Sequence, residues 1–189
     1  MKNNFHHMAA AATLAVAGLF AGASAQAAAV TVDVSGAQSI NLLGEAGNVV
    51  WLIDVGANAL LTSLDWALEL NALSPSVLAE MQVSFGDSSG LNLLTFTPGG
   101  ADYFSGDGSY SGSIDLSSYG VSVGADGLLR LEFSEAFKDI ANGVAEGEWA
   151  SGNLTFGVSV GAVPEPGGVT MTLLGLGLVG LSARRAQRG

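Results

Sequence analysis

The chain has 189 residues, of which 49% are hydrophobic, and its formal net charge is −11. Two apolar terminal segments raise the hydrophobic content. Between residues 28 and 163, 16 acidic residues stand against only Arg130 and Lys138, a balance of −14. We do not expect so acidic a domain to bind nucleic acid, whose phosphates need Lys and Arg, or to bind anionic lipid surfaces, which would repel it. Because the chain has no cysteine, disulfides, thiolate nucleophiles and thiolate metal sites are excluded.

Residues 1–27 have the pattern of a secretory signal peptide. Lys2 provides a positive start, and the uncharged, alanine-rich stretch Met8–Ala23 follows it. Small residues then offer two cleavage sites, Ala23-Ser24-Ala25 and Ala25-Gln26-Ala27. An uncleaved N-terminal anchor is the alternative. We expect the Sec machinery to export the part of the chain that follows.

Residues 28–163 predict one exported, all-β domain. The clearest pattern lies in Leu64–Asn71, where apolar and polar side chains alternate as in a half-buried antiparallel strand. Seven further stretches predict strands: Val30–Val34, Asn48–Val55, Met81–Phe85, Leu91–Phe96, Ser111–Leu116, Leu129–Phe133 and Leu154–Val160. About eight strands, separated by Gly-, Ser-, Asn- and Asp-rich turns, predict an antiparallel β-sandwich or jelly-roll-like domain.

Two short segments of this domain predict helix. In Ser74–Glu80, Ser74 is a suitable N-cap and Pro75 suits the first helical position. Ala136–Ala145 is the second, weaker candidate.

Candidate catalytic groups are few. Histidine occurs only at His6 and His7, inside the predicted signal peptide, so the mature domain has neither a Ser-His-Asp triad nor a histidine zinc site. Asp65 and Glu69 share a strand face about 13 Å apart, beyond the roughly 5–9.5 Å of glycosidase pairs. Glu146 and Glu148 are closer in sequence, and we expect both in a solvated, glycine-flanked loop.

Acidic loops and aromatic residues leave two binding hypotheses open. Asp87–Gly90, Asp102-Tyr103 and Asp107–Ser109 place hard oxygen ligands on glycine-rich loops, as calcium requires, or are simply solvated loops. Four aromatic residues lie between residues 98 and 121, where they either hold a sugar ring or cap the core. They are Tyr103, Phe104, Tyr110 and Tyr119.

The chain ends in a segment with three parts. Val163-Pro164-Glu165-Pro166 cannot continue a strand or helix, because proline lacks the backbone N–H and restricts φ. Residues 167–183 carry no charge, and as a transmembrane helix they would span about 26 Å, close to the ~30 Å of hydrocarbon in a bilayer. A basic tail at residues 184–189 follows, in which Arg184, Arg185 and Arg188 supply the positive charge that stays cytoplasmic.

This order of motif, apolar span and basic tail resembles the PEP-CTERM sorting signal of Gram-negative bacteria. The resemblance implies that an exosortase recognises Pro164-Glu165-Pro166 and removes the span and the tail. The precursor would be tethered in the inner membrane, and the mature form would reach the cell surface or the extracellular space. In that family the signal accompanies exopolysaccharide production and biofilm or floc formation.

The middle of the chain is also similar to short secreted PEP-CTERM proteins, whose sandwich resembles P-domain and lectin-like jelly rolls. The similarity lies in Ser74-Pro75-Ser76, in the turn Gly124–Gly127 and in Trp149 ahead of Gly152–Phe156. We interpret the chain as an exported, non-enzymatic surface or matrix protein without a cofactor, associated with exopolysaccharide or biofilm. Two other classes stay open. One is a carbohydrate-binding, lectin-like module, which calcium would stabilise, and the other is a carboxylate-based glycoside hydrolase.

Overall fold

The structure is a computed structural model that describes residues 26–160. These residues form nine strands and two short 3₁₀ helices. The sorting motif, the predicted span at 167–183, the basic tail and the predicted signal peptide up to Ala25 lie outside the described residues. Within the described range, no helix has the length and hydropathy needed to cross a membrane.

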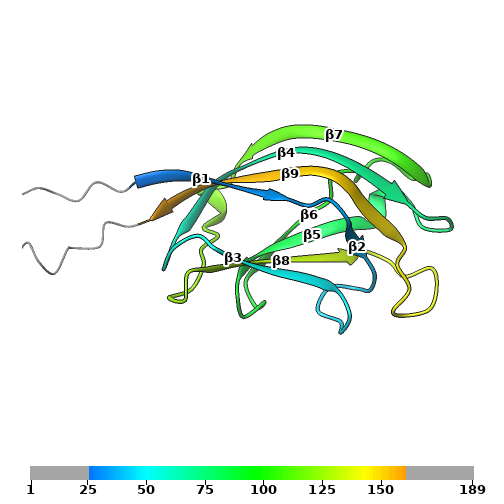
Figure 1. Ribbon diagram of the computed structural model, residues 1–189, viewed down its shortest axis with the longest axis horizontal. Coiled ribbons are helices and arrows are strands. Elements are labelled where there is room, and N and C mark those ends of the chain that lie inside the picture. The colour runs from blue at the N-terminus through cyan, green and yellow to red at the C-terminus, as the bar shows by residue number, and fades with distance from the viewer. Residues whose placement is uncertain (1–25, 161–189) are drawn as a thin grey trace, which may run out of the picture.

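The strands form two antiparallel sheets that pack as two layers (Figure 1). The elements are β1 Gln26–Asp33, β2 Ala37–Ser39, β3 Val49–Asp54, β4 Leu60–Ala72, η1 Leu78–Glu80, β5 Met81–Asp87, β6 Leu93–Phe96, β7 Gly106–Asp115, η2 Ser117–Tyr119, β8 Leu128–Glu135 and β9 Gly147–Val160. The five-stranded sheet has the order β1-β9-β4-β7, with β2 beside β9, and the four-stranded sheet has the order β3-β8-β5-β6. The predicted all-β, antiparallel architecture is confirmed, and each of the eight predicted stretches overlaps a strand.

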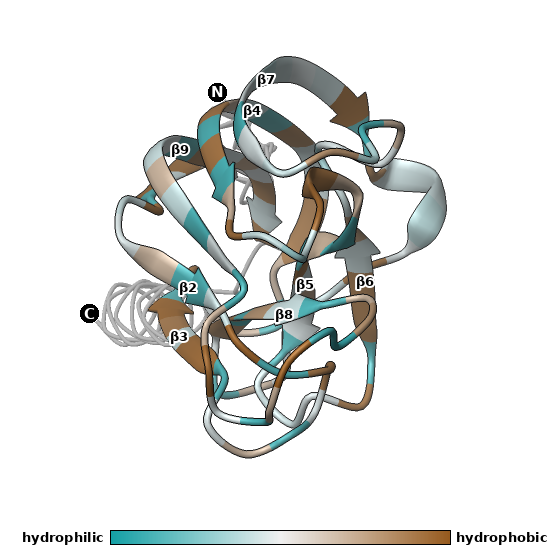
Figure 2. Cartoon of the chain, turned by 90° about the vertical axis from the view of Figure 1, so that its right-hand side faces the viewer, coloured by the Kyte–Doolittle hydropathy of each residue, from teal (hydrophilic) through white to brown (hydrophobic). Residues whose placement is uncertain are grey.

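The core lies between the two sheets and follows from the alternation in the sequence. Leu64 and Leu68 of β4 and Leu131 of β8 are buried, while Asp65 and Glu69 on the opposite face of β4 are exposed. Figure 2 shows this alternation as brown and teal bands along β4 and β9. Each fully buried Leu or Phe side chain contributes about 1.5–3 kcal/mol.

Aromatic rings join the two layers. Phe85 of β5 meets Phe156 of β9 edge to face at 5.1 Å between centroids, and Phe133 of β8 meets Trp149 of β9 in the same way at 5.1 Å. Such pairs add roughly 0.5–1.5 kcal/mol to the burial of the rings.

The chain enters and leaves the domain at the same end. Strands β1 and β9 pair from Asp33 opposite Asn153 to Gln26 opposite Val160. We call the end that holds Gln26 and Val160 the terminal end; the opposite end, where β8 finishes at Glu135, is the distal end (Figure 1). The register places everything that precedes and follows the domain beside the terminal end.

The single helical turn predicted in Ser74–Glu80 is present only in part, and the helix predicted at Ala136–Ala145 is absent. Of Ser74–Glu80, only η1 at Leu78–Glu80 is helical, because the backbone N–H groups of Leu78 and Ala79 bond outward to Phe104 and Asp102. Ala136–Ala145 is irregular. Its backbone N–H groups at Asp139 and Ile140 donate instead to the Glu146 carboxylate.

Candidate functional site

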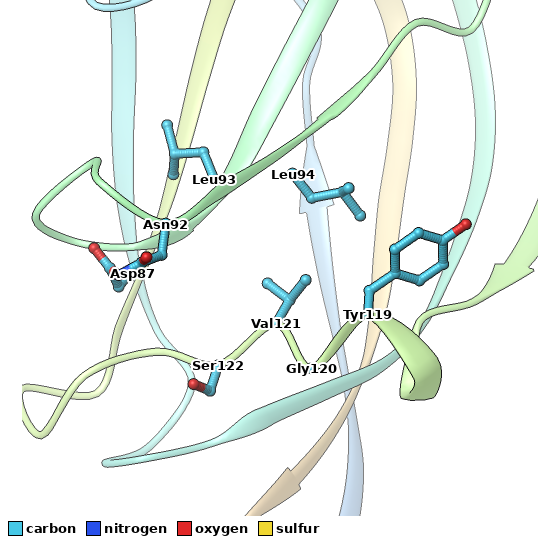
Figure 3. A pocket seen from close by; sticks show the side chains of 8 residues that line it. All are labelled: Asp87, Asn92, Leu93, Leu94, Tyr119, Gly120, Val121 and Ser122. Carbon is cyan, nitrogen blue, oxygen red and sulfur yellow. The ribbon is translucent and has the colours of Figure 1, made fainter.

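A cavity of about 360 Å³ opens at the terminal end, between the β5–β6 hairpin and the segment that crosses from β7 to β8 (Figure 3). Eight residues line it: Asp87, Asn92, Leu93, Leu94, Tyr119, Gly120, Val121 and Ser122. Figure 3 shows Tyr119 and Leu94 at one side, Asp87 and Asn92 at the other, and Val121 and Ser122 below. Two segments separated by 24 residues of sequence, 87–94 and 119–122, therefore build one site.

The crossing segment supplies the aromatic side of the cavity. Leu116 is fully buried and anchors its start, and the Tyr119 N–H donates to the Leu116 carbonyl at 3.0 Å to close η2. Gly120 then adopts a left-handed φ of 64°, a conformation that L side chains rarely adopt. The Leu61 N–H donates to the Val121 carbonyl at 2.9 Å and ties the segment to β4. The Tyr119 side chain is left 55% exposed at the rim of the cavity.

The β5–β6 hairpin supplies the polar side. Asp87 Oδ1 accepts hydrogen bonds from the Ser89 hydroxyl and from the Ser89 N–H (3.0 Å), and Oδ2 accepts one from Asn92 Nδ2 at 2.6 Å. The Ser89 hydroxyl and then the Asn92 amide hold the pKa of Asp87 below its ordinary value. Asp87 is therefore an ionised, oriented acceptor at neutral pH.

No basic side chain lines this cavity. The two basic residues of the described domain are both paired with carboxylates, and the Arg130 side chain lies beside Gly90 of the β5–β6 hairpin without lining the cavity. Arg130 Nη2 lies 2.6 Å from Glu132 Oε2, and Lys138 Nζ lies 2.9 Å from Glu146 Oε1. The cavity therefore combines an aromatic ring, an apolar strip and hydrogen-bond acceptors, and its charge is negative.

The four aromatic residues from the sequence do not gather in one place. Tyr103 is 79% exposed and lies with Phe104 in the loop beside η1, at the distal end. Tyr110 packs against the core, where its hydroxyl donates to Asp102 Oδ2 at 2.6 Å. Burial and, next, the Asp102 carboxylate raise the pKa of Tyr110 to about 12. Core capping is thus correct for Tyr110, and of the four rings only Tyr119 lines the cavity.

The three loops considered for calcium are also separated. Asp87 ends β5 at the terminal end, whereas Asp102 and Asp107 lie near η1 and the start of β7, at the distal end. Asp102 accepts the Tyr110 hydroxyl, and Asp107 accepts the Asn71 amide. Within residues 26–160, no three acidic or histidine side chains are placed to hold one metal ion.

Glu146 differs from the expectation of a solvated loop. It is fully buried, pairs with Lys138, and accepts the N–H groups of Ile140 at 2.7 Å and of Asp139 at 3.0 Å. Burial opposes ionisation, but Lys138 and these N–H groups together bring the pKa of Glu146 below its ordinary value. Glu148 is exposed, as expected, but it lies in strand β9 and not in a loop.

The pKa of Glu135 is shifted in the opposite direction to that of Glu146. Burial raises its pKa to about 7, and the charges of Glu146 and Glu80 act in the same direction. Its Oε2 receives one long hydrogen bond, 3.4 Å from the Ser76 hydroxyl, and its Oε1 is buried without a partner among the described residues. Two carboxyl groups with pKa values moved apart are typical of acid–base pairs.

Glu135 and Glu146 do not line any of the three cavities considered next. Glu135 and Glu146 are both fully buried inside the distal end. Neither lines the cavity of Figure 3, nor the cavity on the outer face of β4, nor the one beside Asn41. Both carboxyl groups are therefore enclosed by protein among the described residues.

Apart from Ala27, the residues predicted to take part in processing precede and follow the described domain in the sequence. Ala23, Ala25, Val163–Pro166, Arg184, Arg185 and Arg188 lie outside the described residues, and Ala27 is an exposed residue of β1. Strand β9 ends at Val160, so Pro164 follows only four residues after the last strand residue. A family model for the PEP-CTERM protein-sorting motif matches residues 162–186. The chain carries a PEP-CTERM sorting signal.

This identification establishes the route of the PEP-CTERM protein. It is exported, its precursor is anchored in the membrane, and an exosortase is its processing partner. The matched residues contain the complete Pro164-Glu165-Pro166 motif, the apolar run and two of the three tail arginines.

Comparison with solved structures gives distant similarity to the domain of this PEP-CTERM protein. A structure of the infectious bursal disease virus Gx strain is 13% identical, with a TM-score of 0.35 over 75% of this chain. A VP2 subviral particle of infectious bursal disease virus is 11% identical, with a TM-score of 0.34 over 75% of this chain. The PEP-CTERM protein spans about a third (34%) of the length of either viral chain. No curated protein matches its sequence.

Sequence reasoning identified part of the cavity in this PEP-CTERM protein. Tyr119 was a candidate for holding a sugar ring, and Asp87 was a candidate calcium ligand, but nothing in the sequence joined them. Asn92 and Ser122 were missed altogether. The Asp87-Ser88-Ser89 sequence was the available signal for Asp87, because an Asp followed two residues later by Ser favours a side-chain turn.

Proposed function

We propose that the exported domain is a non-enzymatic component of the cell surface or extracellular matrix that associates with exopolysaccharide. The observation that carries the proposal is that the carboxyl groups with shifted pKa values are buried, whereas other side chains line the surface cavities. Glu135 and Glu146, whose pKa values are shifted in opposite directions, are both buried in the core. The surface cavities described above are lined by hydroxyl, amide, aromatic, apolar and acidic side chains, a mixture that supports binding to a sugar polymer.

The outer face of the five-stranded sheet supports this role. Ser109 and Ser111 of β7, Glu69 of β4, and Ser151 and Asn153 of β9 line a shallow cavity of about 420 Å³ there. The Ser109 hydroxyl donates to Glu69 Oε2 at 2.6 Å, and the other polar groups face solvent beside it. A face of short hydroxyl and amide side chains suits hydrogen bonding to a polymer rich in hydroxyl groups.

The net charge of the domain indicates which kind of polysaccharide it can bind. The exported domain carries −14. Repulsion therefore disfavours strongly anionic polysaccharides and nucleic acids, especially at low ionic strength. A largely neutral polysaccharide is the partner that this surface fits best.

Cell fractionation tests the proposal. We expect the mature protein in the matrix fraction of wild-type cells, and in the soluble medium when polysaccharide synthesis is deleted. Purified mature protein incubated with the isolated polysaccharide should release no reducing ends. Retention that does not depend on the polysaccharide would contradict the association, and release of reducing ends would contradict the non-enzymatic role.

A further inference from the structure

We propose that the cavity between Tyr119 and Asp87 is a binding subsite for one or two neutral pyranose rings. The inference rests on the proposed function and names the ligand unit that the protein would bind. The cavity lies outside the sorting signal at residues 162–186.

The aromatic side of the cavity fits one face of a sugar. A pyranose ring presents C–H groups on its faces, and these pack against exposed aromatic rings, which carry negative charge on their faces. The Tyr119 side chain is 55% exposed, lies beside Leu94 (Figure 3), and sits on a backbone fixed by η2 and by the buried Leu116. Leu93 and Val121 continue the apolar surface between the two sides of the cavity.

The polar side fits the hydroxyl groups of a sugar. Asp87 is ionised, and the bonds from Ser89 and Asn92 hold its carboxylate in one orientation before any ligand arrives. A sugar hydroxyl that donates to this carboxylate makes a charge-assisted hydrogen bond, about twice as strong as a neutral one. Asn92 uses its Nδ2 on Asp87, so its Oδ1 is available as an acceptor, and the Ser122 hydroxyl can donate or accept.

Size and charge narrow the ligand class. The volume of about 360 Å³ lies at the lower end of the ~300–1,000 Å³ range of ligand sites. Asp126 lies close enough for its pKa to respond to the charge of Asp87, and no Lys or Arg lines the cavity. A uronic acid, a sulfated sugar or a phosphate would meet negative charge, so the ligand is an uncharged sugar.

Binding measurements on the purified mature protein test this site. The probes are the neutral tetrasaccharides cellotetraose, mannotetraose and galactotetraose, with tetragalacturonate as the acidic probe, followed by saturation-transfer NMR and calorimetry. We expect at least one neutral probe to bind and the acidic probe not to bind. Tyr119→Ala should weaken binding about tenfold, and Tyr119→Phe should retain it because the ring, not the hydroxyl, makes the contact.

Tyr103→Ala is the matched control, since Tyr103 is an exposed tyrosine at the other end of the domain. It should leave affinity unchanged, and all variants should unfold at the wild-type temperature. The proposal is overturned if no neutral probe binds at millimolar concentration, or if Tyr119→Ala binds as well as wild type. It is also overturned if Tyr103→Ala loses as much affinity as Tyr119→Ala. Matrix retention without oligosaccharide binding would refute this site and leave the proposed function standing.

Discussion

Glu135 shows how one buried carboxyl group makes this fold sensitive to pH. Its side chain is fully buried, and burial raises its pKa from 4.5 to about 7. The folded protein therefore holds this proton more tightly than the unfolded chain does. The contribution of Glu135 to stability is complete below about pH 4.5 and is lost as the pH rises through 7.

Glu135→Gln should remove this loss, because an amide of the same shape stays neutral. At pH 8 we expect the free energy of unfolding to rise by up to roughly 3 kcal/mol, whereas at pH 4.5 the variant and the wild type should differ little. Urea unfolding at the two pH values measures the difference. Glu148→Gln, at an exposed site, is the control, and equal effects of Glu135→Gln at both pH values would contradict the assignment.

Gly86 sets the close approach of backbones in the β5–β6 hairpin. A Cβ at this position would clash with the Asn92 carbonyl oxygen, and the other near atoms are also backbone atoms of Asn92 and Leu93, which leave little room to adjust. We expect Gly86→Ala to cost about 3 kcal/mol in urea unfolding and to disturb the cavity beside Asn92. Gly100→Ala is the matched control, since its nearest heavy atom lies at 3.4 Å. Equal stabilities of the two variants would disprove this packing argument.

Among the elements, the connection between β8 and β9 depends on a buried ion pair. Glu146 is fully buried and holds Lys138 together with the backbone N–H groups of Asp139 and Ile140. This network takes the place of the helix that the sequence of Ala136–Ala145 suggested.

Lys138→Met should leave the Glu146 carboxylate buried without its counter-charge. The expected loss is about 3–5 kcal/mol, measured by urea unfolding at pH 7. Adding Glu146→Gln to this variant should recover part of the loss, because the uncompensated charge is then removed. A loss below about 1 kcal/mol for Lys138→Met would show that the pair is effectively solvated.

Across the whole molecule, the alternation of side chains was enough to predict the fold class and the eight longer strands. The three-residue β2 is too short for any period to be visible. The start of β7, Gly106–Tyr110, was missed because glycine and serine show no apolar alternation, and Figure 2 shows this strand as mostly pale. Tertiary pairing with β4 makes this segment a strand.

The candidate site was harder to predict, because it depends on which loops meet. Tyr119 and Asp87 are 32 residues apart, and only the crossing from β7 to β8 brings them to one cavity. The burial of Glu146 was unpredictable for a related reason. It requires Lys138 and the two N–H groups of its own loop to converge on the carboxylate.

The termini connect the domain to its sorting route. Because Gln26 pairs with Val160, the predicted signal peptide and the sorting signal both join the domain at its terminal end. The four residues from Val160 to Pro164 reach at most about 14 Å, so the exosortase must act close to the folded domain. Signal cleavage after Ala25 preserves all of β1, whereas cleavage after Ala27 removes the residues paired with Val160 and Ser159.

Intact mass of the protein from wild-type cells and from cells lacking the exosortase tests the sorting route most directly. In wild-type cells we expect a chain that begins at Gln26 and ends within Val163–Pro166. Without the exosortase, the same N-terminus should be joined to a chain that continues to Gly189. An identical C-terminus in both strains would contradict exosortase processing of this protein.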